Sequence, residues 1–140
     1  MLTKQQEQIL MKTAIEYRKR AYAPYSKFCV GSALLAKDGR IFGGCNIENS
    51  AYTPTNCAER TAFFHAVSEG VREFEAIAIV GGKQGGELEF CPPCGVCRQV
   101  MLEFCNPKEF FVLLGTSVEQ YEVLQLEQFV PYAFSSQNLE

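Results

Sequence analysis

The chain has 140 residues, of which 47% are hydrophobic and 21% are charged, and its formal net charge is −3 at neutral pH. This composition is typical of a globular chain, and the length allows one domain with a sizeable core. The negative balance argues against a polynucleotide as the main partner, because proteins that bind nucleic acids usually carry a basic patch. No apolar run approaches the length that crosses a membrane.

The first half of the sequence predicts a helix and then a β-hairpin. The pattern Thr3-x-x-Gln6 is a capping box, and apolar residues at helical spacing follow it to about Arg20. After a loop that contains proline, the apolar stretch 28–36 predicts a strand. Asp38-Gly39 then predicts a tight turn into a second strand, which starts at residue 41 and reaches residues 45–49.

The second half alternates helices and strands. It predicts a helix from Ala58 that stops at Gly70, a strand over 76–80, a glycine-rich loop over 81–86, a helix over 94–104, strands over 110–114 and 121–126, and a short helix over 130–134. This order predicts a sheet with helices on both faces. Functional sites in such sheets form outside the carboxyl ends of the strands.

Seven cysteines are present, an odd number. The first residues lack the apolar core of a secretory signal peptide, so we expect a cytoplasmic protein. In a reducing compartment, closely spaced cysteines indicate metal binding or catalysis more often than disulfides.

Two cysteine motifs carry the strongest functional signal. Cys57-Ala58-Glu59 starts one predicted helix, and Pro93-Cys94-Gly95-Val96-Cys97 starts another. Cys94 and Cys97 share one helix face, and helix N-termini favour the thiolate form that binds metal. Three thiolates can hold zinc and leave its fourth position open, as catalytic sites do. We therefore predict a catalytic zinc site on Cys57, Cys94 and Cys97.

Glu59 follows Cys57 by two residues, which places it near the predicted metal without making it a ligand. A non-ligand glutamate beside a zinc-binding Cys-x-x-Cys pair is the pattern of zinc nucleobase deaminases. In that chemistry zinc-bound hydroxide is the nucleophile, and it attacks a carbon that carries an exocyclic amine. Glu59 is then the predicted proton shuttle.

Arg60 is the predicted partner of the thiolates. Three thiolates and one Zn²⁺ together carry a net negative charge, which weakens the metal as a Lewis acid. A nearby cation that donates to a thiolate offsets this charge. Arg98 is a second candidate, with a surface ion pair as its alternative.

Other interpretations of the same residues stay open. Glu59 can be the third residue of a capping box that begins at Asn56. Cys91 can join the other three cysteines in a closed structural zinc site of a binding protein. A redox pair would use the same Cys-x-x-Cys spacing.

Asn46 and Glu48 flank Ile47 where the second predicted strand ends. Alternate residues of a strand share a face, so the two polar side chains point the same way. Together they can hold a ligand that carries a hydroxyl group. The alternative is the solvated face of an edge strand.

The chain resembles the small, homotetrameric class of cytidine deaminases over nearly its full length. The motifs that carry the resemblance are Tyr22-Ala23-Pro24-Tyr25-Ser26-Lys27-Phe28, Gly44-Cys45-Asn46-Ile47-Glu48-Asn49, Cys57-Ala58-Glu59-Arg60-Thr61-Ala62 and Pro93-Cys94-Gly95-Val96-Cys97-Arg98-Gln99. The resemblance implies one catalytic domain over residues 1–140. It also implies a three-layer α/β/α sandwich around a five-stranded mixed sheet.

The resemblance further implies roles for individual residues. Each subunit would bind one zinc ion on Cys57, Cys94 and Cys97, with Glu59 as the proton shuttle. The substrate-binding residues would be Asn46 and Glu48 at the ribose 3′-hydroxyl, Phe28 and the Ala58 backbone at the base, Ser50 and Tyr52 of a neighbour at the 5′-hydroxyl, and Phe134 of another neighbour over the base. Ser50, in place of a common alanine, and the segment 53–56 depart from the usual pattern.

The expected reaction is hydrolysis of cytidine and 2′-deoxycytidine to the uridines and ammonia, a step of pyrimidine salvage. The expected partners are a small nucleoside and identical subunits of a homotetramer, with no nucleic acid and no membrane. Deamination of another aminopyrimidine is the alternative within the fold. The sequence has no evident phosphate-binding group, which favours a neutral sugar over a nucleotide.

Overall fold

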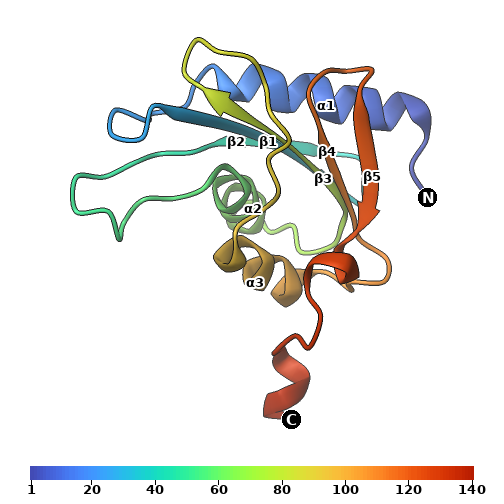
Figure 1. Cartoon of the computed structure of the whole chain (residues 1–140). Coiled ribbons are helices and arrows are strands. Elements are labelled where there is room, and N and C mark those ends of the chain that lie inside the picture. The colour runs from blue at the N-terminus through green and yellow to red at the C-terminus, as the bar shows by residue number, and fades with distance from the viewer.

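The computed structural model describes all 140 residues as helices packed on a single sheet (Figure 1). The elements in chain order are α1 (Lys4–Arg18), β1 (Phe28–Ala36), β2 (Ile41–Cys45), α2 (Ala58–Ser68), β3 (Phe74–Lys83), α3 (Gly95–Phe104), β4 (Phe111–Gly115), β5 (Tyr121–Gln125) and the short 3₁₀ helices η1 (Leu126–Phe129) and η2 (Ser136–Leu139). The strand order is β2-β1-β3-β4-β5. Only β3 and β4 pair in parallel, so the five-stranded mixed sheet is confirmed.

The sheet is the middle of three layers, with α1 on one face and α2 and α3 on the other (Figure 1). Because successive side chains of a strand point to opposite faces, each strand supplies two cores. Ala33 and Leu35 of β1 pack toward α1, whereas Leu34 packs toward α2 and α3. The predicted cover of helices on both faces is therefore confirmed.

Glycines in the hairpin strands let helices approach the sheet closely. A Cβ atom on Gly31 would lie 2.0 Å from the Ala14 carbonyl oxygen of α1. A Cβ atom on Gly44 would lie 2.5 Å from the Ala58 carbonyl oxygen, in the first turn of α2. No real Cβ atom fits at such distances, so both positions require glycine. The close contact at Gly44 sets the position of the first turn of α2 against β2.

The ends of the helices follow the predicted signals. The Thr3 hydroxyl accepts from the Gln6 N–H at 3.1 Å and completes the capping box of α1. Gly70, with φ +88°, follows the end of α2. None of the helices combines the length and the apolar character needed to span a membrane.

Three segments differ from the sequence-based prediction. β3 continues through Gly81 and Gly82, expected as a loop, because β1 is long enough to pair with them. β2 ends at Cys45, and beyond it Ile47 forms only isolated bridges to Tyr22 and Asn56. Residues 130–134 form no helix.

The missing helix has a local cause. Pro131 has no backbone N–H to donate, and Tyr132 adopts a positive φ of 53°, which a right-handed helix cannot contain. The last helical turn comes later, at η2. This C-terminal segment extends away from the sheet below α3 (Figure 1).

Candidate metal centre and substrate pocket

The three predicted zinc ligands come together at two helix N-termini. Cys57 is the N-cap of α2, Cys94 is the N-cap of α3, and Cys97 lies in the first turn of α3. Their sulfur atoms all lie within 4.8 Å of one another, and the Cys57 and Cys94 sulfurs are 3.7 Å apart. A tetrahedral zinc with bonds of about 2.3 Å places its sulfur ligands about 3.8 Å apart. The cluster therefore fits a zinc ion.

The cluster is covered on one side and open on the other. Cys97 is completely buried, Cys57 is half-buried and Cys94 is exposed. Cys91 is not one of the three clustered thiols. Its sulfur lies beside Gly81, where a Cβ atom would be 2.8 Å from it, and burial raises the pKa of this thiol to about 11. The geometry thus favours three thiolates with an open position over a closed four-thiolate site.

Arg60 lies where the charge of the thiolates requires it. Its guanidinium Nη2 donates to the Cys57 sulfur at 3.3 Å. A hydrogen bond with Cys97, together with Arg60, lowers the pKa of Cys57 to about 5. The same hydrogen bond, together with burial, raises the pKa of Cys97. Cys57 is therefore the thiol of the pair that ionises first.

Glu59 is a buried acid beside this cluster, with 4% of its surface exposed. Burial raises the pKa of its carboxyl to about 7, and the nearby Cys57 thiolate acts in the same direction. A group of this pKa can both accept and release a proton near neutral pH. The capping-box interpretation of Glu59 is wrong, since Cys57 is the N-cap and the Asn56 amide donates to the Thr61 hydroxyl instead.

The two residues predicted to contact the base, Phe28 and Ala58, each lie at the start of an element. Phe28 is half-buried at the start of β1, and its ring lies beside Gly81 and Cys91. Ala58 is fully buried in the first turn of α2, where backbone N–H groups have no partner within the helix.

The Asn46 side chain bonds the backbone of β1. Its carbonyl oxygen accepts from the Val30 N–H at 2.9 Å, and its amide donates to the Phe28 carbonyl at 2.8 Å. The expectation that Asn46 and Glu48 share a strand face is wrong, because the strand ends at Cys45. Asn46 instead fixes the first residues of β1.

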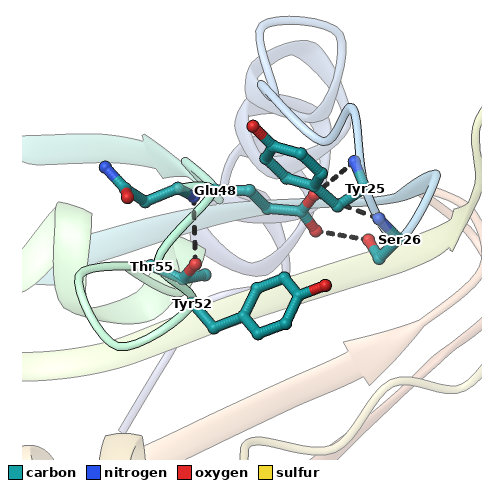
Figure 2. Close-up of a pocket in the computed structure, with 6 residues that line it drawn as sticks. Tyr25, Ser26, Glu48, Tyr52 and Thr55 are labelled. Carbon is teal, nitrogen blue, oxygen red and sulfur yellow. Dashed lines mark hydrogen bonds between the residues drawn. The ribbon is translucent and has the colours of Figure 1, made fainter.

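Glu48 lies in a cavity of about 400 Å³ that we call the loop pocket. Figure 2 shows the Glu48 carboxylate between the Tyr25 and Tyr52 rings. The pocket is lined by Tyr25, Ser26, Glu48, Asn49, Tyr52 and Thr55. The carboxylate accepts from the N–H groups of Tyr25 at 2.9 Å and Ser26 at 3.1 Å, and from the Ser26 hydroxyl. The sequence predicted no role for Ser26, but in the structure this residue donates two hydrogen bonds to Glu48.

Tyr52 lines the pocket that holds Glu48 of its own chain. Its ring meets that of Tyr25 edge to face, with centroids 6.3 Å apart, and its φ is +62°. Ser50, two residues earlier, is exposed. Within one chain, Tyr52 therefore lies beside Glu48, the predicted ribose contact.

Helix α3 holds the C-terminal segment through two side chains. The Arg98 guanidinium donates to the carbonyls of Pro93 at 2.9 Å and Phe129 at 3.2 Å, so it is neither a thiolate partner nor a surface ion pair. Gln99 donates to the Phe134 carbonyl at 2.8 Å. The Phe134 ring itself is 58% exposed. The sequence motif that contains Gln99 did not predict this contact.

Comparison with known proteins agrees with this site. The family model of the cytidine and deoxycytidylate deaminase zinc-binding region matches residues 4–114. A cytidine deaminase of Sporosarcina psychrophila is 54% identical over 124 residues, which are 87% of this chain and 86% of that protein. One of Halalkalibacterium halodurans is 47% identical over 132 residues, covering 94% and 96%.

Solved structures show the same fold. The crystal structure of cytidine deaminase from Burkholderia pseudomallei has a TM-score of 0.80 and 45% identity, covering 90% of this chain and 97% of that one. The cytidine deaminase of Mycobacterium tuberculosis has a TM-score of 0.76 and 37% identity, covering 91% and 95%. The chain therefore belongs to the zinc-dependent cytidine and deoxycytidylate deaminase family.

Proposed function

We propose that the protein hydrolyses cytidine and 2′-deoxycytidine to uridine and 2′-deoxyuridine with release of ammonia, as a step of pyrimidine salvage in the cytoplasm. The observation that carries this proposal is the trio of thiols at zinc-binding spacing with the buried Glu59 beside it. Curated relatives of 54% and 47% identity carry the name cytidine deaminase. The catalytic unit is a single domain over residues 1–140.

Cys57, Cys94 and Cys97 hold the zinc ion in this proposal. A zinc ion held there would supply an acidified water molecule as the nucleophile for the carbon that carries the exocyclic amine. Arg60 supports the cluster by donating to the Cys57 sulfur and offsetting the charge of the thiolates.

Glu59 moves the protons of the reaction. Its carboxylate takes one proton from the attacking water and delivers it to the ring nitrogen. It then takes the second proton, from the hydroxyl now bonded to that carbon, and delivers it to the amine, so that the carbonyl forms as the C–N bond breaks and ammonia leaves. The near-neutral pKa of Glu59 suits both directions of transfer. Because the side chain is buried, bulk water does not compete for the proton.

The loop pocket receives the sugar. Glu48, with Asn46 behind it, is the proposed contact of the 3′-hydroxyl, while Phe28 stacks on the base and the Ala58 N–H binds its carbonyl edge. A carboxylate in the sugar site repels a phosphate group, which favours a nucleoside over a nucleotide. Neighbouring subunits of a homotetramer complete the site with their own Ser50, Tyr52 and Phe134, in addition to the Tyr52 of the same chain that lines the loop pocket.

The deciding experiment follows the ultraviolet absorbance of cytidine with the wild type and Glu59→Ala. We expect the variant to keep its zinc and its melting temperature and to lose turnover by about 10²–10⁴-fold or more. Glu59→Gln, which preserves the shape of the side chain but removes the carboxyl group, is the matched control for loss of volume. It should lose turnover as Glu59→Ala does. Wild-type turnover in either variant would falsify the proposed proton transfer.

A further inference from the structure

Ser26 connects two residues that have separate tasks in the proposed site. The Phe28 N–H donates to the Ser26 hydroxyl oxygen at 3.0 Å, and the hydroxyl donates in turn to the Glu48 carboxylate. Figure 2 shows the second of these bonds, together with the two backbone N–H groups that reach the same carboxylate. The bonds form a continuous chain from the backbone of Phe28 to the side chain of Glu48.

The orientation of the hydroxyl is fixed by this chain. A serine hydroxyl has one hydrogen to donate, and here that hydrogen faces Glu48 while a lone pair faces Phe28. Between the two bonded residues, Lys27 adopts a φ of 58°, which a non-glycine residue reaches only at a cost of about 1 kcal/mol. The hydrogen bond from Phe28 to Ser26 spans Lys27 and holds this turn in place.

We propose that Ser26 is a positioning residue of the deaminase, which sets the Glu48 carboxylate and the Phe28 ring in one fixed arrangement for binding the nucleoside. This inference rests on the proposed function, since it gives Glu48 to the sugar and Phe28 to the base. Ser26 touches neither the thiols nor Glu59. Its removal therefore weakens binding of the substrate and of the transition state alike, which raises KM and leaves kcat nearly unchanged.

Ser26 also keeps Glu48 in its ionised form. The hydrogen bond from the Ser26 hydroxyl is the largest cause that lowers the pKa of Glu48, ahead of the backbone N–H groups and the charge of Lys27. The other titratable groups that face this carboxylate are Tyr52 on its own loop, between β2 and α2, and Tyr25 on the loop of Ser26, between α1 and β1. Hydrogen bonds donated to a carboxylate stabilise its ionised form, so loss of the hydroxyl moves the titration of Glu48 to higher pH.

The test uses a graded series at one position, namely Ser26→Thr, Ser26→Cys and Ser26→Ala. Ser68→Ala is the matched control, because the Ser68 hydroxyl also donates one hydrogen bond, to the His65 carbonyl at the end of α2. Two quantities are measured for each protein. One is the pH dependence of kcat and KM for cytidine, and the other is the titration of the Glu48 carboxyl by ¹³C NMR, assigned with Glu48→Gln.

We expect Ser26→Ala to raise KM about tenfold, to leave kcat within about twofold and to raise the pKa of Glu48. Ser26→Thr restores both values, and Ser26→Cys, a weak donor, lies between. Wild-type KM or a wild-type Glu48 titration in Ser26→Ala overturns the inference, as does a defect of Ser26→Thr as large as that of Ser26→Ala. The NMR titration needs no turnover, so a wild type inactive on cytidine refutes the proposed function without deciding the hydrogen-bond chain.

Discussion

The thiol cluster and the loop pocket lie in one chain but are held in place by different parts of the fold, the first by packed helices and the second by loops. Cys57, Glu59 and Cys97 sit in the first turns of helices that are packed against the sheet, and Glu59 and Cys97 are buried. The residues of the loop pocket come from two loops, and the Tyr25 and Tyr52 rings are 50% and 73% exposed. The thiol cluster and Glu59 are thus fixed by the core, whereas the loop pocket is fixed mainly by hydrogen bonds between loops.

This difference has a physical basis. Metal binding and proton transfer require atoms held within a fraction of an ångström, which packed helices provide. A substrate must enter and leave, and loops with few buried contacts open at lower cost in free energy. Changes near the thiols are therefore expected to act on kcat and zinc content, and changes near the loop pocket on KM.

The largest effect is expected from Cys97→Ser. Cys97 is fully buried, and a serine hydroxyl is a poor replacement for a thiolate as a zinc ligand. Zinc content measured by atomic absorption should fall well below one per chain, and kcat should fall by about 10³-fold or more. Cys105→Ser, a change of a buried cysteine outside the cluster, is the control and should keep its zinc. Full zinc content in Cys97→Ser would contradict the ligand assignment.

Arg60→Ala should have the next largest effect. Loss of the donor to the Cys57 sulfur removes the charge that balances the thiolates, and such changes typically cost about 10–100-fold in metal affinity or activity. Zinc release to a chelator measures the affinity. Arg98→Ala is the matched control, because Arg98 donates only to carbonyls in this region. Equal zinc release from the wild type and Arg60→Ala would remove Arg60 from the metal site.

Gly44→Ala tests whether the sheet fixes the start of α2. The added methyl group would meet the Ala58 carbonyl at 2.5 Å, so the helix must move or the strand must bend. Overpacking of this kind costs about 1–3 kcal/mol of unfolding free energy. Chemical denaturation measures this loss, and kcat should fall with it because Glu59 moves with the helix. Gly95→Ala, which adds a methyl group into open space, should unfold as the wild type does.

The smallest effect is expected from Gln99→Ala. This change removes the bond that holds the Phe134 carbonyl against α3, and a single exposed hydrogen bond contributes about 1 kcal/mol or less. If Phe134 closes a neighbouring pocket, KM should rise by about two- to fivefold while zinc content stays constant. Gln128→Ala, on η1, is a control outside this contact. A change of kcat alone would contradict the division between the two regions.

Much of the fold follows from local patterns in the sequence. The capping box at Thr3, the Asp38-Gly39 turn and the stop at Gly70 each act through neighbouring residues, and each appears in the structure. The extension of β3 through Gly81 and Gly82 does not follow from them. It depends on pairing with β1, more than fifty residues earlier in the sequence, which local signals do not report.

For the site, the sequence by itself determined the chemistry. Three cysteines and a glutamate at helix starts predicted a zinc deaminase, because thiolates are zinc ligands and a carboxylate can transfer protons. The tertiary structure decided the arrangement. It places Cys91 outside the cluster and bonds the Asn46 side chain to the backbone of β1. It also directs Arg98 to the Phe129 carbonyl instead of to a thiolate. These outcomes depend on distances between segments far apart in the chain, and packing sets those distances only once the whole sheet has formed.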